Sequence, residues 1–87
     1  MGRKRKTLDA ILSGKSDTNI RFAPARALLL SLGFDERTSG SHHVFSHPDI
    51  AEFINLQEAK GGQVKPYQVR QLRGLLVKYK ETLGYEE

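Results

Sequence analysis

The apolar stripe that follows Pro66 is the feature that most constrains the fold of this chain. Proline is tolerated at the first position of a helix, where its missing N–H costs nothing. Apolar residues then recur at helical spacing, with Leu75 widening the stripe: Val69, Leu72, Leu76, Tyr79 and Leu83. Gly84 predicts the end of this helix. A helix that is apolar on one side must bury that side against another layer of structure.

Two shorter helices are predicted earlier in the chain. Residues 7–13 place Leu8, Ile11 and Leu12 on one side and stop at Gly14. A polar loop over 15–20 follows. A second helix begins near Pro24, and Gly33 predicts its left-handed C-terminal cap. Its buried stripe consists of Ala25, Leu28, Leu29 and Leu32.

The segment between these helices and Pro66 has the residue pattern of a small β-sheet. Residues 34–39, 42–46 and 52–56 are short, rich in aromatic or β-branched side chains, and separated by turn-forming residues at 40–41 and 47–49. They predict an antiparallel meander, and residues 57–64 predict a flexible loop. The expected fold class is therefore α+β, in the order α-α-β-β-β-α, with the helices packed on one face of the sheet.

The length of 87 residues predicts one domain that spans residues 1–87. The sequence contains no cysteine, so neither a disulfide framework nor a cysteine zinc site is available. No apolar run approaches the roughly 18 residues of a membrane span. The basic run 3–6 resembles the start of a signal peptide, but residues 7–12 are too short and broken for its apolar region. We therefore expect a cytoplasmic protein with no membrane partner, in which residues 1–6 form a flexible basic tip.

The charge is distributed unevenly along the chain. The formal net charge is +4, and residues 60–80 carry six cations and no acid, whereas residues 35–58 carry five acids and one cation. A segment of cations alone favours contact with phosphates, because such contacts are local. A solvated helix face would have the same composition, so charge by itself leaves both interpretations open.

All three histidines lie within six positions, at His42, His43 and His47. A metal site is disfavoured, because His43 and His47 would stand about 13 Å apart on a straight strand. General acid–base chemistry is the second interpretation: if Phe45 faces the core, strand alternation sends His43 and His47 inward and His42 to the open face. The third interpretation is that these are ordinary polar histidines of a small sheet.

Three segments resemble a known family in the right order. Residues 40–45 (Gly-Ser-His-His-Val-Phe) resemble the glycine-x-histidine signature of HicA-type mRNA interferases, the toxins of HicAB toxin–antitoxin pairs. Residues 54–57 look like the third strand of that family, and residues 65–72 look like the opening of its last helix. Residues 4–8 and 14–17 are similar to a longer branch of the family, so the resemblance covers nearly the whole chain.

The resemblance implies a fold like the double-stranded-RNA-binding domain and cleavage of mRNA without a metal or other cofactor. It also implies a HicB-type antitoxin as protein partner. The catalytic histidine of the family corresponds to His42, and its neighbouring glycine to Gly40. One departure is that family members often place an acidic cap before the second helix, where this chain has Ala23-Pro24-Ala25. Loss of such a cap costs about 1 kcal/mol of stability.

On this basis we hypothesise that His42 is the general base for a ribose 2′-hydroxyl. Gly40 would let the RNA backbone approach closely, and Ser41 serves either as a hydrogen-bond donor or simply as a turn residue. His43 is the nearest chemical candidate for the proton donor, although alternation points it inward. Candidate RNA-binding residues outside the histidine segment are Lys65, Arg70 and Arg73 for phosphates and Tyr67 for stacking on a base.

Two other classes of function remain open from the sequence. A non-catalytic RNA-binding module of the same fold would hold RNA through phosphates and 2′-hydroxyls alone. A protein-interaction domain would use the basic C-terminal helix to meet an acidic partner.

Overall fold

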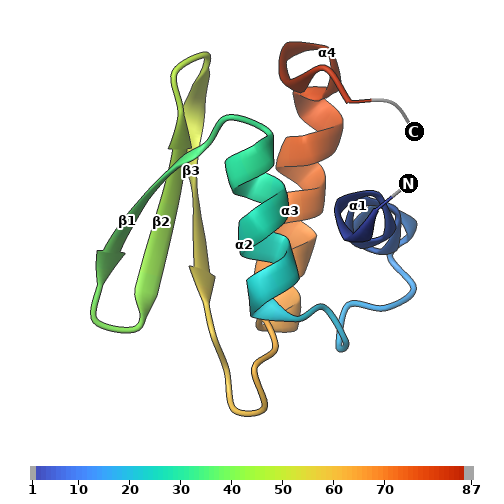
Figure 1. Cartoon of the computed structure of the whole chain (residues 1–87), viewed down its shortest axis with the longest axis vertical. Helices are drawn as coiled ribbons and strands as arrows, with labels where there is room; N and C mark the ends of the chain where they lie inside the picture. The colour runs from blue at the N-terminus through green and yellow to red at the C-terminus, as the bar shows by residue number, and fades with distance from the viewer. Residues whose placement is uncertain (1, 86–87) are drawn as a thin grey trace.

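A computed structural model describes residues 2–85 and shows a sheet with helices on one of its faces (Figure 1). α2 and α3 lie against the sheet, and α1 lies across them on the side away from it. The elements follow one another along the chain as α1 (Arg3–Ser13), α2 (Phe22–Ser31), β1 (Asp35–Ser39), β2 (His42–His47), β3 (Ile50–Gln57), α3 (Pro66–Lys78) and α4 (Lys80–Leu83). The predicted α+β class and element order are confirmed, with one additional short helix at the end.

The sheet is the predicted antiparallel meander, with strand order β1-β2-β3. Glu36 on β1 pairs with Phe45 on β2, and Phe45 pairs with Ile54 on β3. The register between β2 and β3 shifts between Phe45 and His47. β3 begins at Ile50, two residues before the predicted start, because the turn after β2 contains only residues 48 and 49.

The core lies between the sheet and the helices. Phe45 of β2 faces the helices, as predicted, and strand alternation sends Ile54 and Leu56 of β3 to the same side. The largest fully buried side chains are Phe45, Ile11, Leu29, Leu56, Leu72, Leu76, Val64 and Val69. Every helix except α4 contributes to this set or to the other buried residues of the core.

The first helix starts at Arg3, not at Thr7, so most of the basic segment that we expected to be a flexible tip is helical. Lysine and arginine are good helix formers, and the buried Leu8 and Ile11 hold the helix on α2 and α3. The helix ends as predicted at Gly14, whose φ of 72° is left-handed.

The second helix begins at Phe22, and Pro24 lies within its first turn, where a missing N–H is tolerated. No side chain caps this helix, in keeping with the absence of an acidic cap in the sequence. Instead, the N–H of Phe22 donates to the carbonyl of Gly62 at 2.9 Å. Gly33 follows the helix with a φ of 96°, as predicted, and Phe34 returns to the core.

The segment 57–64 is more ordered than the flexible loop that we predicted. Glu58 pairs with Val64 in an isolated antiparallel bridge, and Gln63 pairs with Arg21 in another. The N–H of Ala59 donates to the carbonyl of Gln63 at 2.7 Å. Val64 is buried, so burial of its side chain holds the returning limb of the loop against the helices.

The last helix is interrupted, which the apolar stripe did not predict. Tyr79 leaves helical geometry (φ −110°, ψ 29°), and α4 follows as a single turn that ends at Gly84. The hydroxyl of Tyr79 hydrogen-bonds the carboxylate of Glu52 on β3, and Leu83 packs on the core after the break. Within residues 2–85, no helix has the length and apolar character needed to cross a membrane.

Candidate functional site at the tip of the first hairpin

The tip of the β1–β2 hairpin is a two-residue turn made by Gly40 and Ser41, because Ser39 pairs directly with His42. Gly40 has a φ of 59°, and within residues 2–85 every residue with a positive φ is a glycine. A glycine with positive φ at the first position of a two-residue turn is what a type II′ hairpin requires. The space beside Gly40 is open, since a Cβ built there would meet nothing within 4 Å.

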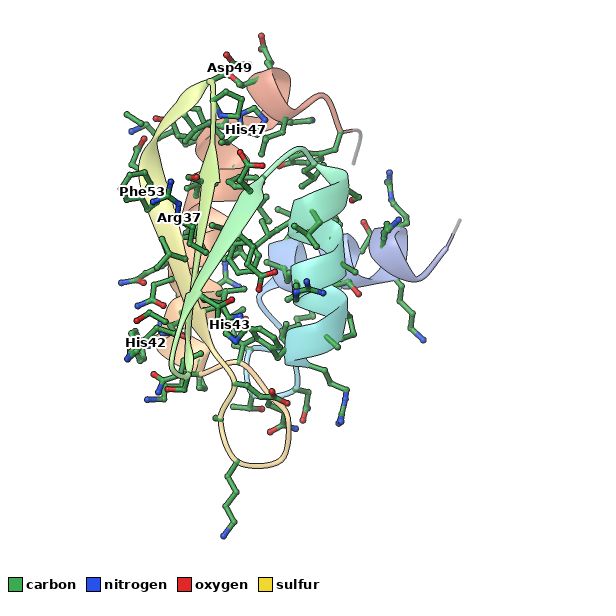
Figure 2. The ribbon with its side chains drawn as sticks, turned by 60° about the vertical axis from the view of Figure 1, so that its left-hand side comes forward. Arg37, His42, His43, His47, Asp49 and Phe53 are labelled. Atoms are coloured by element: carbon green, nitrogen blue, oxygen red, sulfur yellow. The ribbon has the colours of Figure 1, made fainter. Side chains whose placement is uncertain are left out.

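His42 is the first residue of β2 and lies on the open face of the sheet, as strand alternation predicted (Figure 2). Its side chain is exposed, and within residues 2–85 it has no hydrogen-bond or ion-pair partner. The imidazole therefore stands free for a substrate beside an exposed turn.

His43 points to the opposite face and is held there by Glu36 of β1. The His43 Nδ1 lies 2.7 Å from the Glu36 Oε2, and the His43 side chain remains 20% exposed. The ring also packs on Phe22 of α2, with 4.5 Å between the ring centroids. A carboxylate on Nδ1 accepts the N–H of that nitrogen, so Nε2 is the nitrogen left available for proton transfer.

Glu36 is itself fixed by a second partner from α2. The Arg26 Nε donates to the other carboxylate oxygen, Oε1, at 2.7 Å. Burial raises the pKa of Glu36, but hydrogen bonds from His43 and Arg26 outweigh burial, and the pKa falls below its ordinary value of 4.5. The carboxylate is thus charged at neutral pH, and it holds the His43 ring and the Arg26 guanidinium in place.

This histidine–carboxylate pair was not predicted from the sequence, although its signal was present. Glu36 pairs with Phe45, and Thr38 pairs with His43, so both residues of β1 face the helices. Once Phe45 is placed in the core, Glu36 and His43 must share its face. What the sequence does not state is which strand lies beside which, and with what register.

The tip of the hairpin is also connected to the start of α3. The Gln57 side chain donates to the Ser41 hydroxyl at 3.2 Å, and the Gln57 N–H donates to the Gln68 side chain at 2.8 Å. Gln68 in turn donates to the hydroxyl of Tyr67 at 3.4 Å. Gln68 is 3% exposed and is the one buried polar residue within residues 2–85, so this network ties the helix to the tip.

The predicted RNA-binding residues divide into two groups. Tyr67 is 48% exposed at the start of α3, Lys65 immediately precedes that helix, and Arg70 is exposed one turn further on. These residues lie at the end of α3 that the glutamine network joins to the tip. The charge of Arg70 also acts on Asp17, whose pKa it helps to lower.

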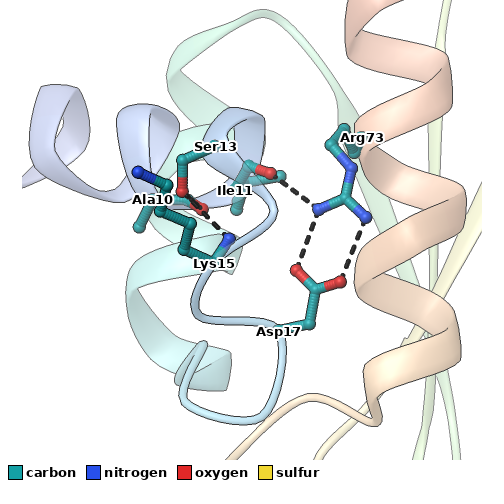
Figure 3. Close-up of polar contacts among 6 residues, drawn as sticks. All are labelled: Ala10, Ile11, Ser13, Lys15, Asp17 and Arg73. Atoms are coloured by element: carbon teal, nitrogen blue, oxygen red, sulfur yellow. Dashed lines mark hydrogen bonds and ion pairs between the residues drawn. The ribbon is translucent and has the colours of Figure 1, made fainter.

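Arg73, which we also predicted to hold RNA phosphates, has its partners inside the protein. Its guanidinium binds both carboxylate oxygens of Asp17, at 2.8 and 3.0 Å, and donates to the carbonyl of Ile11 at 3.0 Å (Figure 3). The hydrogen bond from Arg73 lowers the pKa of Asp17 below 3.8. Arg73 thus fastens α1 and the following loop to α3.

His47 lies at the far end of β2, away from the tip (Figure 2). Its Nδ1 accepts the N–H of Asp49 at 3.0 Å, and its ring packs edge-on against Phe34. Among residues 2–85, no three histidine, aspartate or glutamate side chains gather in a way that would hold a metal ion. The three histidines therefore occupy three different environments.

Comparison of the chain with protein-family models, with curated proteins and with solved structures produced no match.

Proposed function

We propose that this chain is an endoribonuclease that cleaves mRNA and serves as the toxin of a type II toxin–antitoxin pair. The observation that carries the proposal is the exposed imidazole of His42 at the hairpin tip. It has no partner within residues 2–85, and the space beside the neighbouring Gly40 is open. A free imidazole supplies the general base that phosphodiester cleavage needs.

In the proposed reaction, His42 accepts the proton of a ribose 2′-hydroxyl as its oxygen attacks the adjacent phosphorus. The bond from the 2′-oxygen to phosphorus forms, and the bond from phosphorus to the 5′-oxygen breaks. A proton from water passes to this leaving oxygen, because the His43 ring lies on the other face of the sheet, against Glu36 and Phe22. The products are a 2′,3′-cyclic phosphate and a 5′-hydroxyl.

The two histidines point to opposite faces, so the phosphate that is cleaved contacts His42 and not His43. Gly40 and Ser41 are exposed there, and the absence of a side chain at Gly40 allows an RNA backbone to approach closely. Lys65 and Arg70 at the start of α3 are the candidate phosphate ligands, and Tyr67 is the candidate stacking residue. Cleavage should therefore weaken as the salt concentration rises.

The resemblance to HicA-type toxins supports the assignment of a partner and of a fold family. The order α2-β1-β2-β3-α3 agrees with the double-stranded-RNA-binding fold that the resemblance implies, with α1 and α4 as additions. We expect a HicB-type antitoxin to cover the hairpin tip. In that case, added antitoxin suppresses cleavage in proportion to the complex formed.

Cleavage of a labelled single-stranded RNA in EDTA tests the catalytic assignment. We expect His42→Ala to slow cleavage by about 10²- to 10⁴-fold, and His43→Ala to slow it less, because the His43 ring lies on the other face of the sheet. His47→Gln, which changes the histidine away from the tip, should cleave like the parent. All variants are compared after circular dichroism shows that they are folded.

The outcomes separate the competing functions. Loss of cleavage in His43→Ala with full activity in His42→Ala would make His42 the wrong base. RNA binding by every variant with cleavage by none, including the parent, would leave a non-catalytic RNA-binding module. Loss in His42→Ala of the limb of the parent's pH–rate profile that reports a base would support His42 in that role.

A further inference from the structure

The face of the sheet that no helix covers carries an exposed aromatic ring. Phe53 of β3 is 69% exposed, more than any other large hydrophobic residue within residues 2–85. It lies on the same open face as His42 (Figure 2). The proposed reaction does not use Phe53, and the core does not bury it.

A hollow of about 600 Å³ lies beside this ring. Three strands line it: β1 through Arg37, Thr38 and Ser39, β2 through Val44 and Ser46, and β3 through Phe53. Arg37 is exposed, and its guanidinium has no partner within residues 2–85. The hollow thus combines one aromatic surface, one free cation and several hydroxyl groups, and it contains no acid.

We propose that this hollow is a subsite for an unpaired base of single-stranded RNA, which stacks on Phe53 while Arg37 binds a neighbouring phosphate. The subsite rests on the proposed function, because it extends the path of the RNA beyond the hairpin tip. His42 and Ser46 are four residues apart on β2, which separates the two ends of the path by about 13 Å. The base on Phe53 therefore belongs to a nucleotide beyond the one that is cleaved.

The lining favours RNA over a protein partner. Val44, Ala51 and Phe53 are the apolar residues at the outward positions of the three strands, and the remaining outward positions are polar or charged. A protein interface buries a wider apolar centre than these side chains offer. Aromatic stacking requires an unpaired base, so the subsite selects single strands over duplexes.

Binding of a fluorescein-labelled single-stranded RNA, followed by anisotropy at several salt concentrations, tests the subsite. The measurement uses the His42→Ala background so that no RNA is cut. We expect Phe53→Ala to weaken binding by about 5- to 150-fold with an unchanged salt slope, because stacking is not ionic. Arg37→Gln should reduce the salt slope by about 0.7, the value for one phosphate contact on a single strand.

Two controls separate stacking from other effects. Phe53→Tyr keeps an aromatic ring and should bind like the parent background. Val77→Ala removes an exposed side chain of α3 that is 59% exposed and lies outside the hollow, and it should also leave affinity unchanged. Unchanged affinity in Phe53→Ala, or equal losses in Phe53→Ala and Val77→Ala, would overturn the subsite.

A third result would replace RNA with protein as the occupant. If Phe53→Ala leaves RNA affinity intact but abolishes self-association in sedimentation experiments, the open face is a protein interface and the proposal is wrong. The subsite and the proposed function fail separately. Phe53-dependent binding without cleavage by the parent removes the nuclease only, whereas cleavage with Phe53-independent binding removes the subsite only.

Discussion

Replacing Asp17 with asparagine should reveal how much the contact between α1, its following loop and α3 stabilises the domain. The Asp17 and Arg73 side chains are 17% and 23% exposed, and two of their contacts are 2.8 and 3.0 Å long. Breaking a fully buried ion pair costs about 3–5 kcal/mol, and an exposed pair contributes about 0–1 kcal/mol. With roughly a fifth of each side chain exposed, we expect Asp17→Asn to lower the free energy of unfolding by about 2 kcal/mol.

The assay is urea unfolding followed by circular dichroism, with thermal melts in parallel. For a domain of this size, a loss of about 2 kcal/mol corresponds to a fall in Tm of about 8–16 °C. Arg73→Met should cost more than Asp17→Asn, because it also leaves the Ile11 carbonyl without the donor that lies 3.0 Å away. The double variant should then be less destabilised than the sum of the two single variants.

The pH dependence gives an independent check on the same pair. The Arg73 hydrogen bond lowers the pKa of Asp17 below its ordinary value of 3.8. The contribution of Asp17 is therefore fully present above about pH 4 and is lost as the pH falls through the lowered folded-state pKa. The difference in stability between the parent and Asp17→Asn should shrink in acid.

A matched control comes from an exposed pair in α1. Asp9→Asn removes the negative charge that lies 3.3 Å from Arg5, in a pair whose side chains are 39% and 57% exposed. Such helical pairs contribute about 0.2–0.5 kcal/mol. If Asp17→Asn costs no more than Asp9→Asn, and the double-variant cycle shows no coupling, our reasoning about the partly buried pair is wrong.

Three further predictions concern the hairpin and the core. Glu36→Gln should flatten the acid limb of stability between pH 3 and 7 in urea titrations. Burial raises the pKa of Glu36, but hydrogen bonds from His43 and Arg26 lower it by more, so its contribution to stability is present above about pH 4.5 and is lost in acid. An unchanged limb would contradict the pairing. Gly40→Ala should cost about 1–2 kcal/mol through its φ of 59° alone, because a Cβ there meets nothing; a neutral effect in thermal melts would show that the turn can change type. Phe45→Ala should lower the unfolding free energy by about 3–5 kcal/mol, since Phe45 is fully buried at the centre of the sheet, and a loss below about 1 kcal/mol would refute its place in the core.

The ends of the elements were predicted best where a glycine or proline stands at the boundary. Gly14, Gly33 and Gly84 have the left-handed φ expected just beyond a helix, and Pro66 opens α3. These residues act through their own backbone geometry, which does not depend on the rest of the fold. Boundaries without such residues, at Arg3 and at Tyr79, were missed because packing on other elements decides them.

The face assignments were predictable because strand alternation is also local. Placing Phe45 in the core was enough to put His42 on the open face and His43 on the covered face, and both assignments agree with the structure. Alternation does not say which residues of the other strands and helices lie beside His42 and His43. Whether the exposed Phe53 adjoins a hollow depends on how three strands pair, which the sequence leaves open.

The sequence by itself determined the apolar helix stripes, the turns and the histidine segment of this protein, because each depends only on residues close together in the sequence. Only the tertiary structure decided which side chains meet. Arg73 binds Asp17 across 56 positions, and Gln68 is brought to Gln57 across the loop 58–65. Both contacts depend on how α3 docks on its neighbours. Such docking is set by the summed burial of many side chains, so no local pattern reveals that one arginine is committed internally while Arg37 remains free.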